Sequence, residues 1–133
     1  MKICRRETFN AAHRLQKPEW SEAKNLEVFG KFSYPNYHGH NYALEVWVEG
    51  EIDPETGFVI DLKKLKEIIL SQIIERFDHR NLNLDCVEFE NLNPTTENIA
   101  IVIWNILRNT IDGKFNIEVQ LSETEKNKVV YGG

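Results

Sequence analysis

The stretch Tyr37-His38-Gly39-His40-Asn41-Tyr42 places two histidines one residue apart, directly before the alternating segment 43–49 (ALEVWVE). Apolar residues occupy the even positions of that segment and glutamates occupy odd positions, which predicts a β-strand from His38 to about Glu51. Because side chains alternate along a strand, both histidines project to the same face as the apolar residues.

A pair of imidazoles at the end of a half-buried strand suits a zinc site. Zinc takes neutral imidazole nitrogens at about 2.0–2.1 Å, and a catalytic site keeps one coordination position open after three protein ligands. The alternative interpretation of a lone His-x-His pair, two exposed or hydrogen-bonded histidines in an ordinary strand, stays open at this point.

A second predicted strand, residues 2–13, ends in a third histidine. Phe9, Ala11 and His13 share one parity, so His13 also lies on a face with apolar neighbours. His13, His38 and His40 together make a set of three imidazoles with room for a water or a substrate oxygen. Zinc held by such a set polarises a bound hydroxyl or carbonyl group.

The composition fits one domain, residues 1–133, which is 41% hydrophobic and 11% aromatic. A net charge of −5 without any Lys/Arg run argues against a nucleic-acid surface, but it leaves room for a local basic pocket. No apolar run approaches the roughly 18 residues of a membrane span, and no signal-peptide pattern opens the chain, so a cytoplasmic protein is expected. Cys4 and Cys86 suggest no disulfide framework.

Two amphipathic helices are expected after the central strand. A helical turn over residues 21–28 and a loop through Gly30 and Pro35 come first, and the turn residues 53–57 (DPETG) lead to a short returning strand at 58–60. Asp61 is expected to cap the first helix, whose buried stripe consists of Leu62, Leu65, Ile69 and Ile73.

The second helix is predicted to start in residues 93–97 (NPTTE), with a threonine as cap and Glu97 in the first turn. Asp112-Gly113 is expected to end it, with Gly113 at the C′ position. Its buried stripe is expected to contain Ile99, Val102, Ile103, Ile106 and Leu107.

Residues 115–121 (FNIEVQL) alternate without interruption and predict a strand with odd positions inward. Glu123 continues the inward row, so its carboxylate either frays into solvent or is placed there for a ligand. With a last short strand at 129–131, the order ββααββ predicts an α+β fold, an antiparallel sheet with both helices on one face.

The segment 78–83 (DHRNLN) breaks the helical periodicity and predicts a loop. It contains Asp78 next to His79, and a carboxylate that orients and charges an imidazole is a common acid–base device. Ordinary loop polarity is the alternative, and the two interpretations are equally open on these residues alone.

As a set, seven motifs in order resemble the 6-pyruvoyltetrahydropterin synthase family, which includes the bacterial 6-carboxytetrahydropterin synthases of the queuosine pathway. The resemblance extends from about residue 7 to residue 131. The motifs are 9–15 (FNAAHRL), 29–31 (FGK), 35–42 (PNYHGHNY), 50–57 (GEIDPETG), 78–82 (DHRNL), 94–98 (PTTEN) and 123–124 (ET).

The resemblance implies the tunnelling fold (T-fold), in which four-stranded sheets close into a barrel in a trimer and two trimers stack as a homohexamer, with sites between subunits. It implies zinc, and the substrate 7,8-dihydroneopterin triphosphate, which loses triphosphate to become a 6-pyruvoyl or 6-carboxy tetrahydropterin. The product and the pathway, whether biopterin, queuosine or folate, stay open.

The resemblance also implies roles for individual residues. His13, His38 and His40 would hold zinc, and Asp78 with His79 would form the proton-relay dyad. Glu123 would bind the pterin N–H edge in the bidentate manner of a carboxylate. Lys31 is a candidate for the triphosphate by proximity. The pterin pocket would be lined by Thr95, Thr96 and Glu97.

One position departs from the family pattern. The family places a catalytic cysteine six residues before the first histidine of His-Gly-His, and Phe32 stands there in this chain. A thiolate can remove and return a proton, whereas a phenyl ring can only pack. Relatives that cleave the pterin side chain use a glutamate instead, and no acidic residue lies between Phe32 and His38.

Ser33, Glu27 and the Asp78–His79 dyad stay open as substitutes for the thiol. Phe32 favours a second interpretation beside the synthase, a pterin-binding family member with weak, absent or side-chain-cleaving activity. A third interpretation is a hexameric α+β scaffold with histidines at strand ends.

Overall fold

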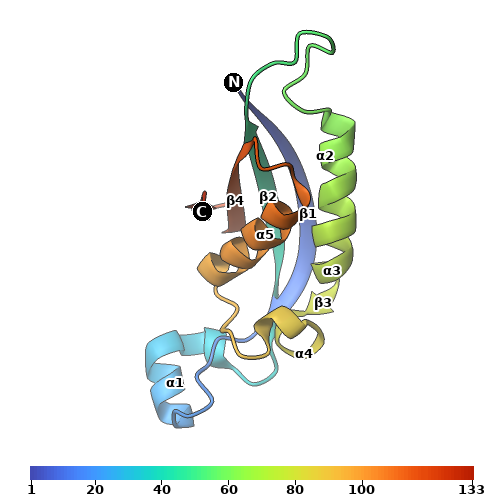
Figure 1. Cartoon of the computed structure of the whole chain (residues 1–133). Coiled ribbons are helices and arrows are strands. Elements are labelled where there is room, and N and C mark those ends of the chain that lie inside the picture. Colours follow the sequence, from blue (N-terminus) through green and yellow to red (C-terminus); the bar gives the residue numbers. More distant parts are fainter.

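A five-stranded sheet in the order β3-β1-β2-β4-β5 organises the computed structural model, which describes all residues from Met1 to Gly133 (Figure 1). Neighbouring strands are antiparallel, as the sequence predicts, and one two-residue parallel pairing of β1 with β3 is added at the edge of the sheet. The strands are β1 (Lys2–His13), β2 (His38–Glu49), β3 (Arg80–Asn81), β4 (Asn116–Thr124) and β5 (Asn127–Tyr131).

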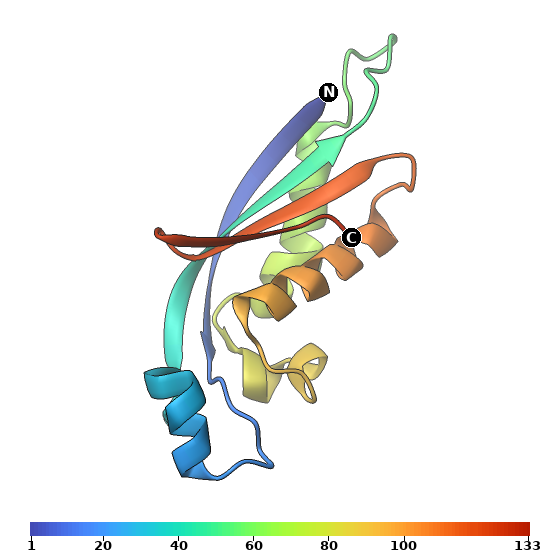
Figure 2. The ribbon, with the colours of Figure 1, turned by 90° about the vertical axis from the view of Figure 1, so that its left-hand side faces the viewer.

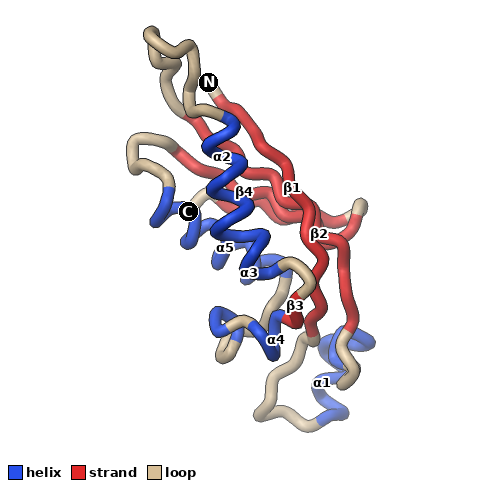
Figure 3. The backbone as a smooth tube through the Cα atoms, turned by 90° about the vertical axis from the view of Figure 1, so that its right-hand side faces the viewer, coloured by secondary structure: helices blue, strands red, loops and turns tan.

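Helices α2 (Leu62–Ile69) and α5 (Thr96–Thr110) cover the same face of the sheet, as the side views show (Figures 2 and 3). None of the helices is both long and apolar enough to cross a membrane. The helical elements are α1 (Glu22–Phe29), a 3₁₀ turn (Gly30–Ser33), α2 (Leu62–Ile69), a π-helical turn (Leu70–Ile74), α3 (Glu75–Phe77), α4 (Leu82–Asp85), a second 3₁₀ turn (Val87–Phe89) and α5 (Thr96–Thr110).

Side-chain caps start α1, α2 and α5, and those of α2 and α5 lie where the sequence predicts them. Ser21 accepts a hydrogen bond from the Lys24 N–H, and Asp61 accepts one from the Lys63 N–H. Thr95 accepts one from the Asn98 N–H, which identifies it as the capping threonine of α5. Each cap satisfies an amide that the first turn of a helix leaves without an intrahelical partner.

Two sequence-based expectations around α2 were wrong. Residues 58–60 form no strand, because β2 already has β1 on one side and β4 on the other and offers no free edge. Leu62 is 48% exposed and does not belong to the buried stripe. The stripe instead continues past Ile73 to Phe77, through the π-helical turn and α3.

Two further boundaries differ from the prediction. The segment 78–83 is a loop only at its start, because β3 and the first turn of α4 occupy residues 80–83. Helix α5 ends at Thr110, three residues before Gly113, because Ile111 turns extended and buries its side chain. Arg108 then binds the carbonyl oxygens of Ile111, Asp112 and Phe115, so no glycine cap is needed.

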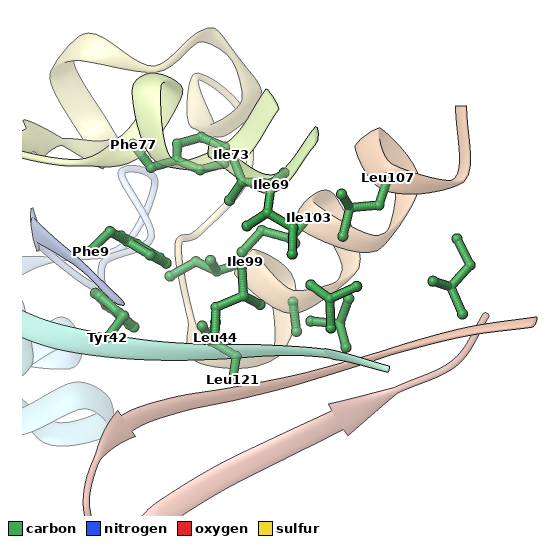
Figure 4. Packing of buried hydrophobic residues seen from close by; sticks show 14 of the residues in the cluster. Phe9, Tyr42, Leu44, Ile69, Ile73, Phe77, Ile99, Ile103, Leu107 and Leu121 are labelled. Atoms are coloured by element: carbon green, nitrogen blue, oxygen red, sulfur yellow. The ribbon is translucent and has the colours of Figure 1, made fainter. Parts of the chain in front are cut away.

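The core lies between the sheet and the two helices (Figure 4). The inward rows that alternation predicts on β1, β2 and β4 are buried, and they meet the stripes of α2 and α5. Residues of this interface that are at most 3% exposed include Phe9, Tyr42, Leu44, Leu121, Ile69, Ile73, Phe77, Ile99, Ile103 and Leu107.

The register between β1 and β2 determines which histidines meet. His13 lies directly opposite His38, and Ala11 lies opposite His40. Side chains across neighbouring strands at such positions are in contact distance. The last residue of β1 and the first residues of β2 therefore bring the three predicted metal ligands to one end of the sheet.

Candidate metal and substrate site

His13, His38 and His40 form a compact cluster at that end of the sheet. One ring nitrogen from each lies within 4.8 Å of the others, and the ring centroids are 4.6 to 5.0 Å apart. All three Nε2 atoms are buried and have no hydrogen-bond partner. Buried polar atoms without partners are rare and call for an explanation, and a shared metal ion supplies one.

The residue before the α5 cap orients the first of these histidines. His13 is completely buried, and its Nδ1 lies 2.8 Å from the carbonyl oxygen of Pro94. A carbonyl oxygen can only accept, so Nδ1 carries the hydrogen and Nε2 keeps a free lone pair. Metal-binding histidines usually have such a partner on the second nitrogen. The hydroxyl of Tyr42 lies 3.4 Å from the same Nδ1.

The surroundings favour the neutral form of His13 and His38, the form that binds a metal. Burial lowers the pKa of His13 to about 4, and the neighbouring rings of His38 and His40 act in the same direction. The pKa of His38 is lowered by burial first and then by His40, with a smaller effect of the nearby Lys31 ammonium. Burial and the charge of Glu123 raise the pKa of the Tyr42 hydroxyl, so it stays protonated.

Glu123 connects the cluster to a cavity. Its Oε1 lies 3.5 Å from Nε2 of His13 and 3.4 Å from Nε2 of His40, and its side chain is 16% exposed. Because His13 is neutral, its contact with the carboxylate is not an ion pair. Of the two positions open to Glu123 on sequence grounds, fraying into solvent and facing inward, the structure has the second.

The cavity has a volume of about 620 Å³ and a polar and an apolar wall. The polar wall contains all four residues to which the family resemblance gives a role in pterin binding, Thr95, Thr96, Glu97 and Glu123. The hairpin between β4 and β5 adds two lysines. The lining is completed by Leu15, Phe29, Phe32, Lys126, Asn127, Lys128 and Val129.

Phe32 lies where the missing thiol is expected, beside the histidine cluster. Its ring centroid is 5.3 Å from that of His38, and the residue is 37% exposed and lines the cavity. Neither nearby alternative base faces that cavity. Ser33 is buried with its hydroxyl donating to the Gly30 carbonyl oxygen, and Glu27 lies on the exposed side of α1.

The two cysteines do not replace the thiol. Burial, followed by the charge of Glu45, raises the pKa of Cys4 to about 11, and burial with nearby acidic residues raises the pKa of Cys86 to about 11. Neither side chain lines the cavity. Both are therefore thiols, not thiolates, at neutral pH.

Asp78 and His79 form a pair, but away from the cavity of their own chain. Asp78 Oδ2 lies 2.9 Å from His79 Nδ1, and Asp78 Oδ1 accepts a hydrogen bond of 2.8 Å from the Asn10 N–H. The bond from Asn10 is the main cause that lowers the pKa of Asp78. His79 has a positive φ of 58°, its N–H donates to the Asn10 carbonyl oxygen, and its side chain is 81% exposed.

The donor set fits a zinc ion. Three imidazoles with converging, unpartnered Nε2 atoms supply the His₃ arrangement of a catalytic zinc site. Sequence patterns identify these three residues, but they do not identify the Pro94 carbonyl or the Tyr42 hydroxyl behind His13. Pro94 is 81 residues from His13 in the chain, so only the folded structure reveals their contact.

An antiparallel sheet with two long helices on one face, closed at one end by a histidine cluster, defines a tunnelling-fold protein. The family model of 6-pyruvoyl tetrahydropterin synthase matches residues 2–133. The chain belongs to this family, as the motifs around the histidines indicated.

Individual relatives agree with this assignment. The 6-pyruvoyl tetrahydrobiopterin synthase of Drosophila melanogaster is 46% identical over 132 residues, which cover 98% of this chain and 79% of that protein. The dihydroneopterin monophosphate aldolase of Pyrococcus furiosus is 37% identical over 129 residues, covering 96% of this chain and 91% of that protein. The solved 6-pyruvoyl tetrahydropterin synthase of Caenorhabditis elegans matches with a TM-score of 0.93 at 39% identity, covering 100% of this chain and 95% of that chain.

The low pKa of His13 makes the stability of the metal-free protein depend on pH. The unfolded chain binds a proton on this residue below its ordinary pKa of 6.5, whereas the folded chain does so only below about 4. The contribution of His13 to the free energy of unfolding is therefore fully present above pH 6.5, and it decreases as the pH falls toward 4. We expect the free energy of unfolding to be about 1 kcal/mol lower at pH 5.5 than at pH 7.5 from this residue alone.

Urea unfolding of chelator-treated protein at the two pH values measures this difference. H13Q should reduce the difference, and H79Q, at an exposed histidine, should leave it unchanged. An equal pH dependence in H13Q and the parent chain would contradict the assignment to His13.

Proposed function

We propose that this chain is a zinc-dependent pterin synthase that converts 7,8-dihydroneopterin triphosphate to a 6-pyruvoyl or 6-carboxy tetrahydropterin with loss of triphosphate. One observation carries the proposal. Three buried Nε2 atoms without partners converge beside a cavity whose polar wall holds Glu123 and the first turn of α5. The family membership and the Drosophila relative support the same activity.

Different residues of the cavity would bind different parts of a pterin. Glu123 presents a carboxylate that accepts two N–H groups from the pterin edge, and Thr95 to Glu97 border the same space. His13, His38 and His40 would hold zinc beside the substrate's side-chain hydroxyls. Zinc bound there would acidify the carbinol protons next to the hydroxyl that it contacts.

Proton transfer needs a group that Phe32 does not supply. We assign it to the Asp78–His79 dyad, in which Asp78 accepts from Nδ1–H and leaves His79 Nε2 free to exchange a proton. His79 is exposed and lies outside the cavity of its own chain. The family resemblance implies a homohexamer, a dimer of trimers, and we propose that in such an assembly the dyad of one chain serves the site of a neighbour.

A second candidate function is pterin binding with weak or side-chain-cleaving activity. Phe32 beside His38 favours it, because the position that would carry a thiol carries an apolar wall. The aldolase of Pyrococcus furiosus is a relative with a different reaction. Product identity separates the two candidates, because the synthase yields a tetrahydropterin with a 6-pyruvoyl or 6-carboxy group, whereas the alternative leaves the substrate unconverted or yields a pterin with neither group.

Metal content and turnover test the first proposal directly. The purified protein should hold about one zinc per chain, H38A should lose it, and H79A should retain it. Zinc-loaded protein should convert 7,8-dihydroneopterin triphosphate to a tetrahydropterin that chromatography resolves. Turnover no higher than that of the zinc-free protein would remove the synthase assignment for this substrate, and zinc retained by H38A would remove the metal assignment.

A thiol returned to position 32 tests the part played by Phe32. F32C places a thiol beside His38, so we expect kcat to rise about tenfold or more, because a positioned base contributes roughly 10²–10⁴-fold. F29C is the matched control, since Phe29 lines the same cavity but stacks on Trp20 instead of on the cluster. Equal turnover in F32C and the parent chain would show that the missing thiol does not limit the reaction.

Mixed oligomers test whether sites are shared between chains. H38A and H79A should each be inactive, and reassembly from an equal mixture should restore about a quarter of the parent activity, because a quarter of shared sites then combine two intact halves. A mixture of H38A and H13A should restore no activity, since both changes damage the histidine cluster and no chain in the mixture then has an intact one. No recovery in the first mixture would place dyad and cluster in one chain's site.

A further inference from the structure

An arm formed by residues 14–37 projects from the end of the sheet where the histidines lie. It leaves β1 directly after His13, contains α1 and the 3₁₀ turn Gly30–Ser33, and rejoins the sheet at His38. Figure 1 shows α1 at the lower end of the molecule, apart from α2 and α5. The arm carries the apolar side of the cavity, because Leu15, Phe29 and Phe32 all belong to it.

Arg14 binds the two ends of this arm together. Its Nε–H donates to the carbonyl oxygen of Ser33 over 2.7 Å, and the N–H of the following Leu15 donates to the carbonyl oxygen of Phe32 over 2.8 Å. Both acceptors lie in the last residues of the 3₁₀ turn, where carbonyl groups lack partners within the turn. The backbone on both sides of the Phe32 side chain is thereby tied to the residues that follow His13.

Asn83 of α4 in turn holds Arg14. The Asn83 side chain accepts from the Arg14 N–H over 2.8 Å and donates to the Arg14 carbonyl oxygen over 2.9 Å. These two hydrogen bonds use both the oxygen and the nitrogen of the Asn83 side-chain amide, and they fix the orientation of the Arg14 backbone. A continuous chain of contacts therefore runs from α4 through Arg14 to the wall of the cavity.

We propose that Arg14 is a positioning residue that holds Phe32 against His38 and so sets the apolar wall of the cavity. The proposal rests on the proposed function, since the wall matters when a pterin occupies the cavity. A charged donor on a carbonyl oxygen makes a stronger bond than a neutral one, and its loss weakens a coupled equilibrium about tenfold. Arg14 itself does not line the cavity, so its effect must pass through Phe32.

Hydrogen exchange and pterin affinity test the proposal in the full-length protein. R14Q should speed amide exchange in residues 30–33 and weaken binding of 7,8-dihydroneopterin about tenfold, while the zinc content stays unchanged. R6Q is the control, because Arg6 lies on β1, the strand that leads into Arg14, is exposed and makes no side-chain hydrogen bond. It should change neither quantity.

A double-mutant comparison separates positioning from general stabilisation. In the F32A background, R14Q should cause no further loss of pterin affinity, because the side chain that Arg14 positions is already absent. The same loss in both backgrounds, or unchanged exchange in residues 30–33, would overturn the proposal. If the parent chain binds no 7,8-dihydroneopterin, the proposed function fails, and the exchange comparison alone decides whether Arg14 positions the Phe32 turn.

Discussion

The antiparallel pairing of β1 with β2 is the constraint on which the rest of the molecule depends. Its register places His13 opposite His38 and also sets the buried row from Phe9 and Tyr42 onward. A shift by one residue would place the rows of β1 and β2 on opposite faces of the sheet, so the core and the histidine cluster would be lost together. Packing against α2 and α5 therefore stabilises the same register that the site needs.

Helix α5 contributes to the site by its position more than by its side chains. Its packed stripe brings the segment before Thr95 to the sheet, and the Pro94 carbonyl then reaches Nδ1 of His13. The same helix start borders the cavity through Thr96 and Glu97. Burial of apolar surface along α5 thus determines which nitrogen of a histidine, more than 80 residues away, is free to bind.

Local patterns in the sequence predict most of this fold, because alternation and helical periodicity are local. They identify the inward rows of β1, β2 and β4, the cap Asp61, a threonine cap for α5, and the three histidines. They fail where elements distant in the sequence determine the local conformation. Residues 58–60 have strand-like side chains but no free edge to pair with, and Ile111 turns extended because the core takes its side chain. The clasp of Arg14 by Asn83, 69 residues apart, leaves no local signal either.

Phe32 also changes the chemical vulnerability of the site. Sites that use a thiolate are inactivated when peroxide or an alkylating agent modifies that sulfur. Here an aromatic ring stands beside the histidine cluster, and the two cysteines of the chain have pKa values raised to about 11 and lie outside the cavity. The cavity therefore contains no oxidisable sulfur, and its binding capacity does not depend on the redox state of the surrounding solution.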